Sequence, residues 1–219
     1  MSDMSMMWMR MPGQTWLSVG ASFLGMWTVM MAAMMLPSLV PMLMRYRRAL
    51  DMRTDSRVNA LTALVSFGYF SVWTLLGAVV FPLGVAIAAV ETRLPALTHV
   101  APIAVGVVVL IAASLQFTAW KARRLAWCRD TPAHESTLTA DARSAWRHGL
   151  CLGVHCAESC AGLMAILLVI GVMNLPAMAA VTAAITIERL APNGPRVARA
   201  IGTVGVAAGV CLIAFAAAT

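Results

Sequence analysis

The sequence predicts an all-α membrane protein, a polytopic bundle of about six transmembrane helices that forms one transmembrane domain over residues 1–219. Two observations support this class. Hydrophobic residues make up 61% of the 219 residues and charged residues only 11%, with a mean hydropathy of +0.82, so polar surface is too scarce to cover a water-soluble globule. The charges are also grouped, which leaves long uncharged stretches.

The first half of the chain predicts three helices. Residues 11–44, 58–90 and 94–120 contain no Asp, Glu, Lys or Arg. Each stretch exceeds the ~20 residues that a helix needs to cross the hydrocarbon core of a bilayer. We therefore expect helices over approximately 16–44, 60–90 and 97–120.

The second half predicts three more helices. Residues 148–187 carry one formal charge, Glu158, and are too many for one crossing. The segment GVMNLP at 171–176 favours a tight turn, and Pro176 suits the first turn of a new helix. Helices are expected over 148–171, 175–190 and 199–218. The fifth is short, so the fourth and fifth could instead form a re-entrant hairpin.

The basic residues predict the orientation. Of the 16 Lys and Arg residues, five lie in residues 45–57 and six in 121–147, and the last connection holds Arg189, Arg196 and Arg199. The positive-inside rule places these three loops in the cytoplasm and both termini outside. Multi-pass insertion in a bacterial inner membrane, with the lipid bilayer as partner, follows from this pattern. Nucleic-acid binding is disfavoured because no basic stretch is interleaved with stacking aromatics.

Residues 149–162, GLCLGVHCAESCAG, place three of the five cysteines, a histidine and a glutamate in apolar sequence. Such side chains are costly in hydrocarbon and together form a ligand set for a soft or borderline metal ion. On a regular helix they occupy two faces about 120° apart, so either Gly149 and Gly153 loosen the first turn or the faces serve different purposes. One face holds His148, Cys151, His155 and Glu158, and the other holds Cys156 and Cys160.

Methionines repeat along the first helix. Met30 and Met34 share one side and Met31 and Met35 a neighbouring one, ahead of Pro37. Thioethers suit Cu(I), although methionine also serves as a flexible packing residue. The candidate metal ligands are Met30, Met34, Cys151, His155, Cys156, Glu158 and Cys160.

Three motifs carry a family resemblance. They are MMAAMMLPS at 30–38, Gln116-x-Thr118-x-x-Lys121 with Leu125 and Cys128, and His155-Cys156 followed by CAGLM at 160–164. Their order and spacing resemble an uncharacterised bacterial family of predicted metal-binding integral membrane proteins. The resemblance covers roughly residues 16–212 and implies metal binding by thiols.

The chain departs from that family pattern at two places. Relatives tend to have Cys-x-Gly-Cys-Cys where this chain has Cys156-Ala157-Glu158-Ser159-Cys160, and they often carry a cysteine where it has Arg124. The remaining mixed set of sulfur, nitrogen and oxygen ligands suits copper, with zinc as an alternative.

The function expected from these patterns is metal handling within the membrane, by binding or relaying copper. The chain has no nucleotide-binding motif, so transfer would follow a gradient or a partner such as a metallochaperone. One alternative is a structural or assembly subunit of a larger membrane complex, suggested by Gly and Ala in the last two helices. A thiol or metal oxidoreductase is a more distant alternative. Glu188 is expected to form an interfacial ion pair rather than to join a polar site with the fourth helix.

Overall fold

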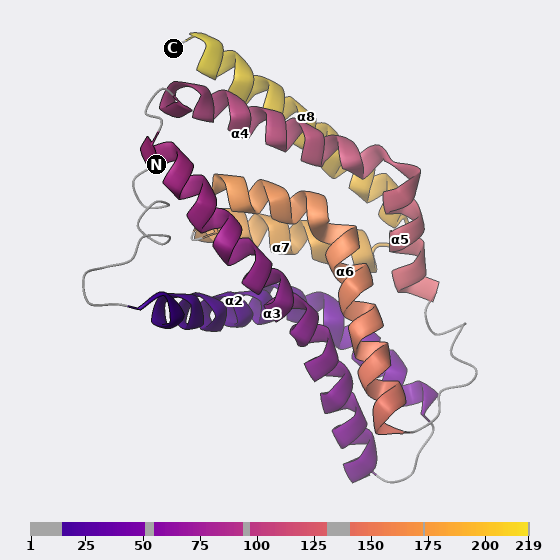
Figure 1. Cartoon of the computed structure of the whole chain (residues 1–219). Helices are drawn as coiled ribbons and strands as arrows, with labels where there is room; N and C mark the ends of the chain where they lie inside the picture. The colour runs from indigo at the N-terminus through magenta and orange to yellow at the C-terminus, as the bar shows by residue number, and fades with distance from the viewer. Residues whose placement is uncertain (1–14, 51–54, 94–96, 131–140, 173, 219) are drawn as a thin grey trace.

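The computed structural model describes residues 15–50, 55–93, 97–130, 141–172 and 174–218. Within these ranges the chain forms helices only, which confirms the all-α class. The elements are α2 (Trp16–Ala49), α3 (Asp55–Arg93), α4 (Leu97–Ser114), η1 (Leu115–Phe117), α5 (Ala119–Asp130), α6 (Ala142–Ile170), α7 (Leu175–Leu190) and α8 (Gly194–Ala218) (Figure 1). The N-terminal 14 residues of the expected domain lie outside the described residues.

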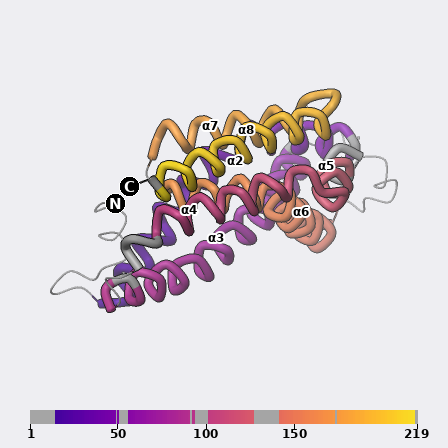
Figure 2. Tube along the Cα trace, turned by 90° about the horizontal axis from the view of Figure 1, so that it is seen from above, coloured from indigo at the N-terminus to yellow at the C-terminus, as the bar shows by residue number. Residues whose placement is uncertain are grey.

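Helix α6 occupies the centre of the bundle. It packs most extensively on α3 and also contacts α4, α5 and α7, while α2 lies against α3 and α7. Helices α4 and α8 run alongside one another in both views (Figures 1 and 2). The buried core is therefore concentrated where α2, α3, α6 and α7 meet.

Four of the described helices are long and apolar enough to cross a membrane: α2, α3, α6 and α8. A fifth span is possible if α4, η1 and α5 act as one bent crossing. Helix α7 has 16 residues and covers about 24 Å, short of the ~30 Å hydrocarbon core. Composition thus supports four or five of the six expected spans.

The third predicted helix, 97–120, is wrong at its C-terminal end. The α-helix stops at Ser114, η1 tightens the chain, and Thr118 adopts an extended conformation before α5 begins. The direction of the chain changes by 61° at this break. The Thr118 hydroxyl explains the restart, because it donates to the Leu115 carbonyl at 2.7 Å and accepts from the Lys121 backbone N–H at 3.2 Å. Residues 121–147, expected as a loop, accordingly include most of α5 and the start of α6.

The other predicted boundaries vary in accuracy. Helix α7 begins and ends where predicted, since Gly171 adopts a left-handed φ of 120° and the Asn174 side chain accepts from the Ala177 N–H at 3.0 Å. Helix α6 begins six residues before the predicted position because the Asp141 carboxylate caps it, accepting from Ser144 N–H at 2.6 Å. Helices α2, α3 and α8 also extend beyond their apolar stretches into charged sequence.

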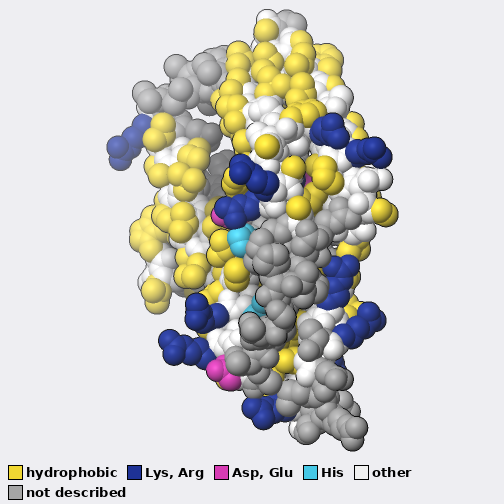
Figure 3. Space-filling view, turned by 90° about the vertical axis from the view of Figure 1, so that its right-hand side faces the viewer, with side chains coloured by type: hydrophobic (Ala, Val, Ile, Leu, Met, Phe, Trp, Pro, Cys, Tyr) yellow, Lys and Arg dark blue, Asp and Glu magenta, His cyan; other side chains and the backbone are white. Residues whose placement is uncertain are grey.

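Most described basic side chains lie at one end of the bundle. There α2 ends, α3, α6 and α8 begin, and α5 packs, whereas the start of α2 and the end of α8 lie at the opposite end (Figure 1). The face that contains α5 displays many of these Lys and Arg side chains (Figure 3). We refer to this end as the basic end.

Candidate functional site

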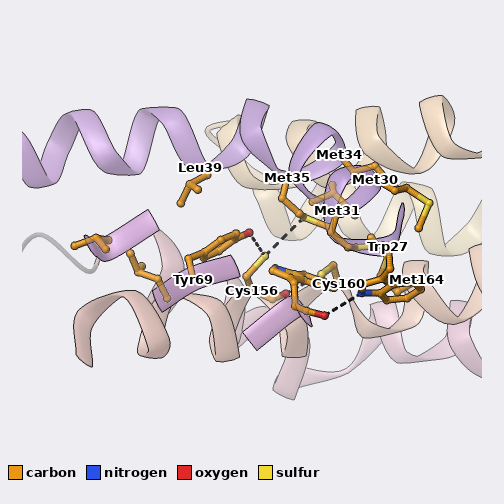
Figure 4. Close-up of a cluster of buried hydrophobic side chains, with 14 of the residues drawn as sticks. Trp27, Met30, Met31, Met34, Met35, Leu39, Tyr69, Cys156, Cys160 and Met164 are labelled. Atoms are coloured by element: carbon orange, nitrogen blue, oxygen red, sulfur yellow. Dashed lines mark hydrogen bonds between the residues drawn. The ribbon is translucent and has the colours of Figure 1, made fainter. Parts of the chain in front are cut away.

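Two buried thiols on α6 face α2 and α3. Cys156 is 0% exposed and Cys160 1% exposed. The Cys156 sulfur lies 2.8 Å from the Tyr69 hydroxyl oxygen and 3.9 Å from the Met35 sulfur (Figure 4). The Cys160 thiol lies one turn further along α6 and donates to the Cys156 carbonyl oxygen at 2.8 Å. We call Met35, Cys156 and Cys160 the sulfur cluster.

The methionine run of α2 supplies the opposite wall. Met31 and Met35 are both 0% exposed, and Met35 is the residue whose sulfur contacts Cys156. Met30 and Met34, the predicted ligands, are also buried in the same core. The neighbouring methionine stack, which the sequence equally allowed, therefore carries the contact with α6.

Close packing of α3 and α6 sets this geometry. A Cβ atom at position 149 would collide with the Val65 carbonyl oxygen, and one at position 153 would lie 3.0 Å from the Tyr69 carbonyl oxygen. Glycine at both positions lets the two backbones approach, so the Tyr69 hydroxyl reaches Cys156 on the next turn. Helix α6 is continuous through both glycines, so the first of the two alternatives, a loosened first turn, is not what the structure has. The two faces of the helix contact different neighbours.

The second face of α6 forms a separate polar cluster with α5. His155 Nδ1 and Glu158 Oε2 are 3.1 Å apart, and Arg124 Nη1 lies 3.1 Å from each of these two atoms. These side chains are partly exposed, and the guanidinium neutralises the carboxylate. His155 and Glu158 are thus held toward α5, on the other side of α6 from Cys156. Cys151, another predicted ligand, is exposed.

A buried ionic network lies behind the sulfur cluster. Lys121 Nζ on α5 is 2.8 Å from Glu188 Oε2 on α7, with the two side chains 5% and 3% exposed. Lys121 also donates to the Ser159 carbonyl oxygen, and Arg189 Nη2 donates to the Ser159 hydroxyl at 2.9 Å. The Ser159 hydroxyl in turn donates to the Cys156 carbonyl at 2.9 Å. The expected interfacial role of Glu188 is therefore wrong: the residue is buried and joins a polar network with α6.

Sequence reasoning missed most of this network. The sequence pattern assigns Lys121 to a loop and Arg189 to the basic residues that set the orientation in the membrane. Ser159 occupies a position where members of the resembled family tend to have cysteine. The Gln116-x-Thr118-x-x-Lys121 motif was a usable clue, because it combines polar residues at the end of a long apolar stretch. Within the described residues, no three His, Cys, Asp or Glu side chains are placed to hold one metal ion. At the centre, the Cys156 thiol meets the Met35 thioether and the Tyr69 hydroxyl.

These features define an all-helical protein with four helices of membrane-spanning length and a buried cluster of sulfur atoms. Residues 24–212 match the family model PpoB2, described as copper chaperone, and the chain belongs to that family. The match includes the α2 methionines, the α5 motif and the α6 cysteines. Comparisons with curated proteins and with solved structures found no match.

Proposed function

We propose that this protein binds Cu(I) as cargo in the sulfur cluster and passes it to a partner, while embedded in the bacterial inner membrane with its basic end in the cytoplasm. The observation that carries the proposal is the contact between the Cys156 and Met35 sulfurs, with the Cys160 thiol buried one turn along α6, within a chain of the copper chaperone family. Thiolate and thioether are the ligands that select Cu(I). The separation of His155 and Glu158 from these sulfurs favours copper over zinc.

The charge of the surroundings suits such a complex. Cu(I) bound by two thiolates carries one net negative charge, which is costly inside a bundle unless it is compensated. The Arg189 guanidinium lies close to Cys156 and is buried at 6% exposure. Arg189 would therefore supply the opposite charge, while its hydrogen bond to Ser159 holds it in place.

The two thiols are arranged to bind rather than to form a disulfide. They lie at i and i+4 of a continuous helix, where disulfide geometry is not reached without distortion, and Cys160 is hydrogen-bonded to the backbone. This arrangement disfavours the thiol oxidoreductase. The glycines of α8 do not support the alternative of a subunit in a larger complex. Gly205 and Gly209 lie against Ala113 and Leu110 of α4, so they serve helix packing within this chain.

The test is an anaerobic Cu(I) titration of purified protein against a chromophoric Cu(I) chelator. We expect one tightly bound Cu(I) per chain, loss of binding in the Cys156→Ala, Cys160→Ala double variant, and retention in the matched Cys151→Ala, Cys211→Ala variant, whose changes are at exposed positions. X-ray absorption of the loaded protein should show sulfur scatterers only. Equal copper binding by the two double variants would remove the sulfur cluster from the proposal.

A further inference from the structure

A pocket lies where the third membrane segment breaks. It has a volume of about 270 Å³ and is bounded by η1 and the start of α5 on one side and the start of α8 on the other. Its polar lining includes Gln116, Lys121 and Arg199, and its apolar lining includes Phe117, Leu125 and Pro195. The pocket is thus amphipathic, with positive charge on two of its walls.

Gln116 gives the pocket an unmet hydrogen-bonding capacity. Its side chain is only 5% exposed, and neither amide atom makes a well-formed hydrogen bond, although the Glu188 carboxylate is close enough to interact with the amide. A buried amide without well-formed hydrogen bonds costs free energy, so the position suits a ligand that accepts its N–H groups. Of the two neighbouring cations, Lys121 is already paired with Glu188, so the exposed Arg199 guanidinium is the group that favours an anionic acceptor over a cation or a neutral group.

The charges around the pocket support an anion. Glu188 pairs with Lys121 but does not line the pocket, so the pocket itself presents no carboxylate. Arg199 is exposed on the first turns of α8, where its Nε donates to the Pro195 carbonyl at 3.4 Å, and no ion pair to it is found among the described residues. Its guanidinium remains able to bind phosphate oxygens.

The location identifies the source of the anion. The pocket is at the basic end, beside apolar helix surfaces, and basic pockets between transmembrane helices on the cytoplasmic side bind anionic lipid headgroups. We propose that this pocket binds the phosphate group of an anionic phospholipid, with Gln116, Lys121 and Arg199 contacting the phosphate and Phe117 and Leu125 contacting the acyl chain. The inference rests on the proposed membrane location and is independent of copper binding.

Native mass spectrometry of the detergent-solubilised protein tests the pocket. Dioctanoyl phosphatidylglycerol is titrated against dioctanoyl phosphatidylcholine, and inorganic phosphate is added in a third series at equal ionic strength. We expect one phosphatidylglycerol to bind tightly, with affinity about tenfold lower in Arg199→Gln and in Gln116→Leu. Arg196→Gln is the matched control, because Arg196 is equally exposed on the same turn of α8 and does not line the pocket.

Equal binding by Arg199→Gln and Arg196→Gln, or equal affinity for the two lipids, would overturn the proposal. Competition by inorganic phosphate at similar concentration would assign the pocket to phosphate from solution and overturn the lipid assignment. The Cu(I) titration is repeated on the same variants. If copper binding is unchanged and lipid selectivity is absent, the proposed lipid site is refuted and the proposed copper site in the sulfur cluster is unaffected.

Discussion

The Cys156 thiol on α6 lies 3.9 Å from the Met35 thioether on α2, so two sulfur-containing side chains separated by 121 positions meet inside the bundle. Neither side chain is exposed to the surroundings. A Cu(I) ion held between them would be shielded from water and from adventitious oxidation.

Replacement of Met35 by leucine tests the thioether. Leucine keeps the volume and apolar character of the site and removes the sulfur, so the fold should persist. We expect Cu(I) affinity to fall about tenfold, or ~1.4 kcal/mol, in the chelator competition assay. Met34→Leu is the control, since Met34 is equally buried at 3% exposure. A larger loss of Cu(I) affinity in Met34→Leu than in Met35→Leu would identify Met34, which the sequence predicts, as the thioether ligand.

Replacement of Gly149 by alanine tests the close packing of α3 and α6. The new Cβ would collide with the Val65 carbonyl oxygen, which belongs to a helix backbone and cannot move aside easily. We expect destabilisation by about 1–3 kcal/mol, seen as a lower Tm by tryptophan fluorescence. Gly25→Ala in α2 is the control because a Cβ there meets nothing within 4 Å. Similar Tm values for the two variants would show that α6 does not depend on this contact.

Replacement of Glu188 by glutamine tests the buried ionic network. The change leaves Lys121 buried without its carboxylate partner, and breaking a buried pair in this way costs about 3–5 kcal/mol. Glu158→Gln removes a carboxylate that is 31% exposed, so we expect ~1 kcal/mol or less. The double variant Lys121→Met, Glu188→Gln should recover part of the lost Tm. Failure of this rescue would mean that Lys121 is held mainly by Ser159.

Cysteines introduced at the two ends of α3 test the orientation. In a variant without native cysteines, Ser56→Cys and Thr92→Cys place exposed thiols at the basic end and the opposite end of one helix. A membrane-impermeant maleimide should label Thr92→Cys in intact cells with a permeabilised outer membrane, and Ser56→Cys only after the inner membrane is opened. The reverse pattern would contradict the proposed cytoplasmic location of the basic end.

Several local features were predictable because they depend on short-range chemistry. The turn at Gly171 and the bounds of α7 follow from a glycine, a capping asparagine and a proline within six residues. The break at Thr118 was not predicted, because residues 94–120 are uniformly uncharged and hydropathy does not detect a hydroxyl that redirects the backbone. The early start of α6 was also not predicted, because the helix begins in polar sequence, where hydropathy gives no helix signal, and is capped there by Asp141.

The sequence by itself determined that the chain is helical and apolar, that its basic residues are grouped in three segments, and that His155 and Cys156 occupy different faces of one helix. These properties depend on composition and on the 3.6-residue period, which act within single elements. The tertiary structure alone decided that the sulfur of Cys156 meets that of Met35, and that Glu188 is buried with Lys121. Such contacts depend on how closely helices approach, which Gly149 permits but which no single segment can specify.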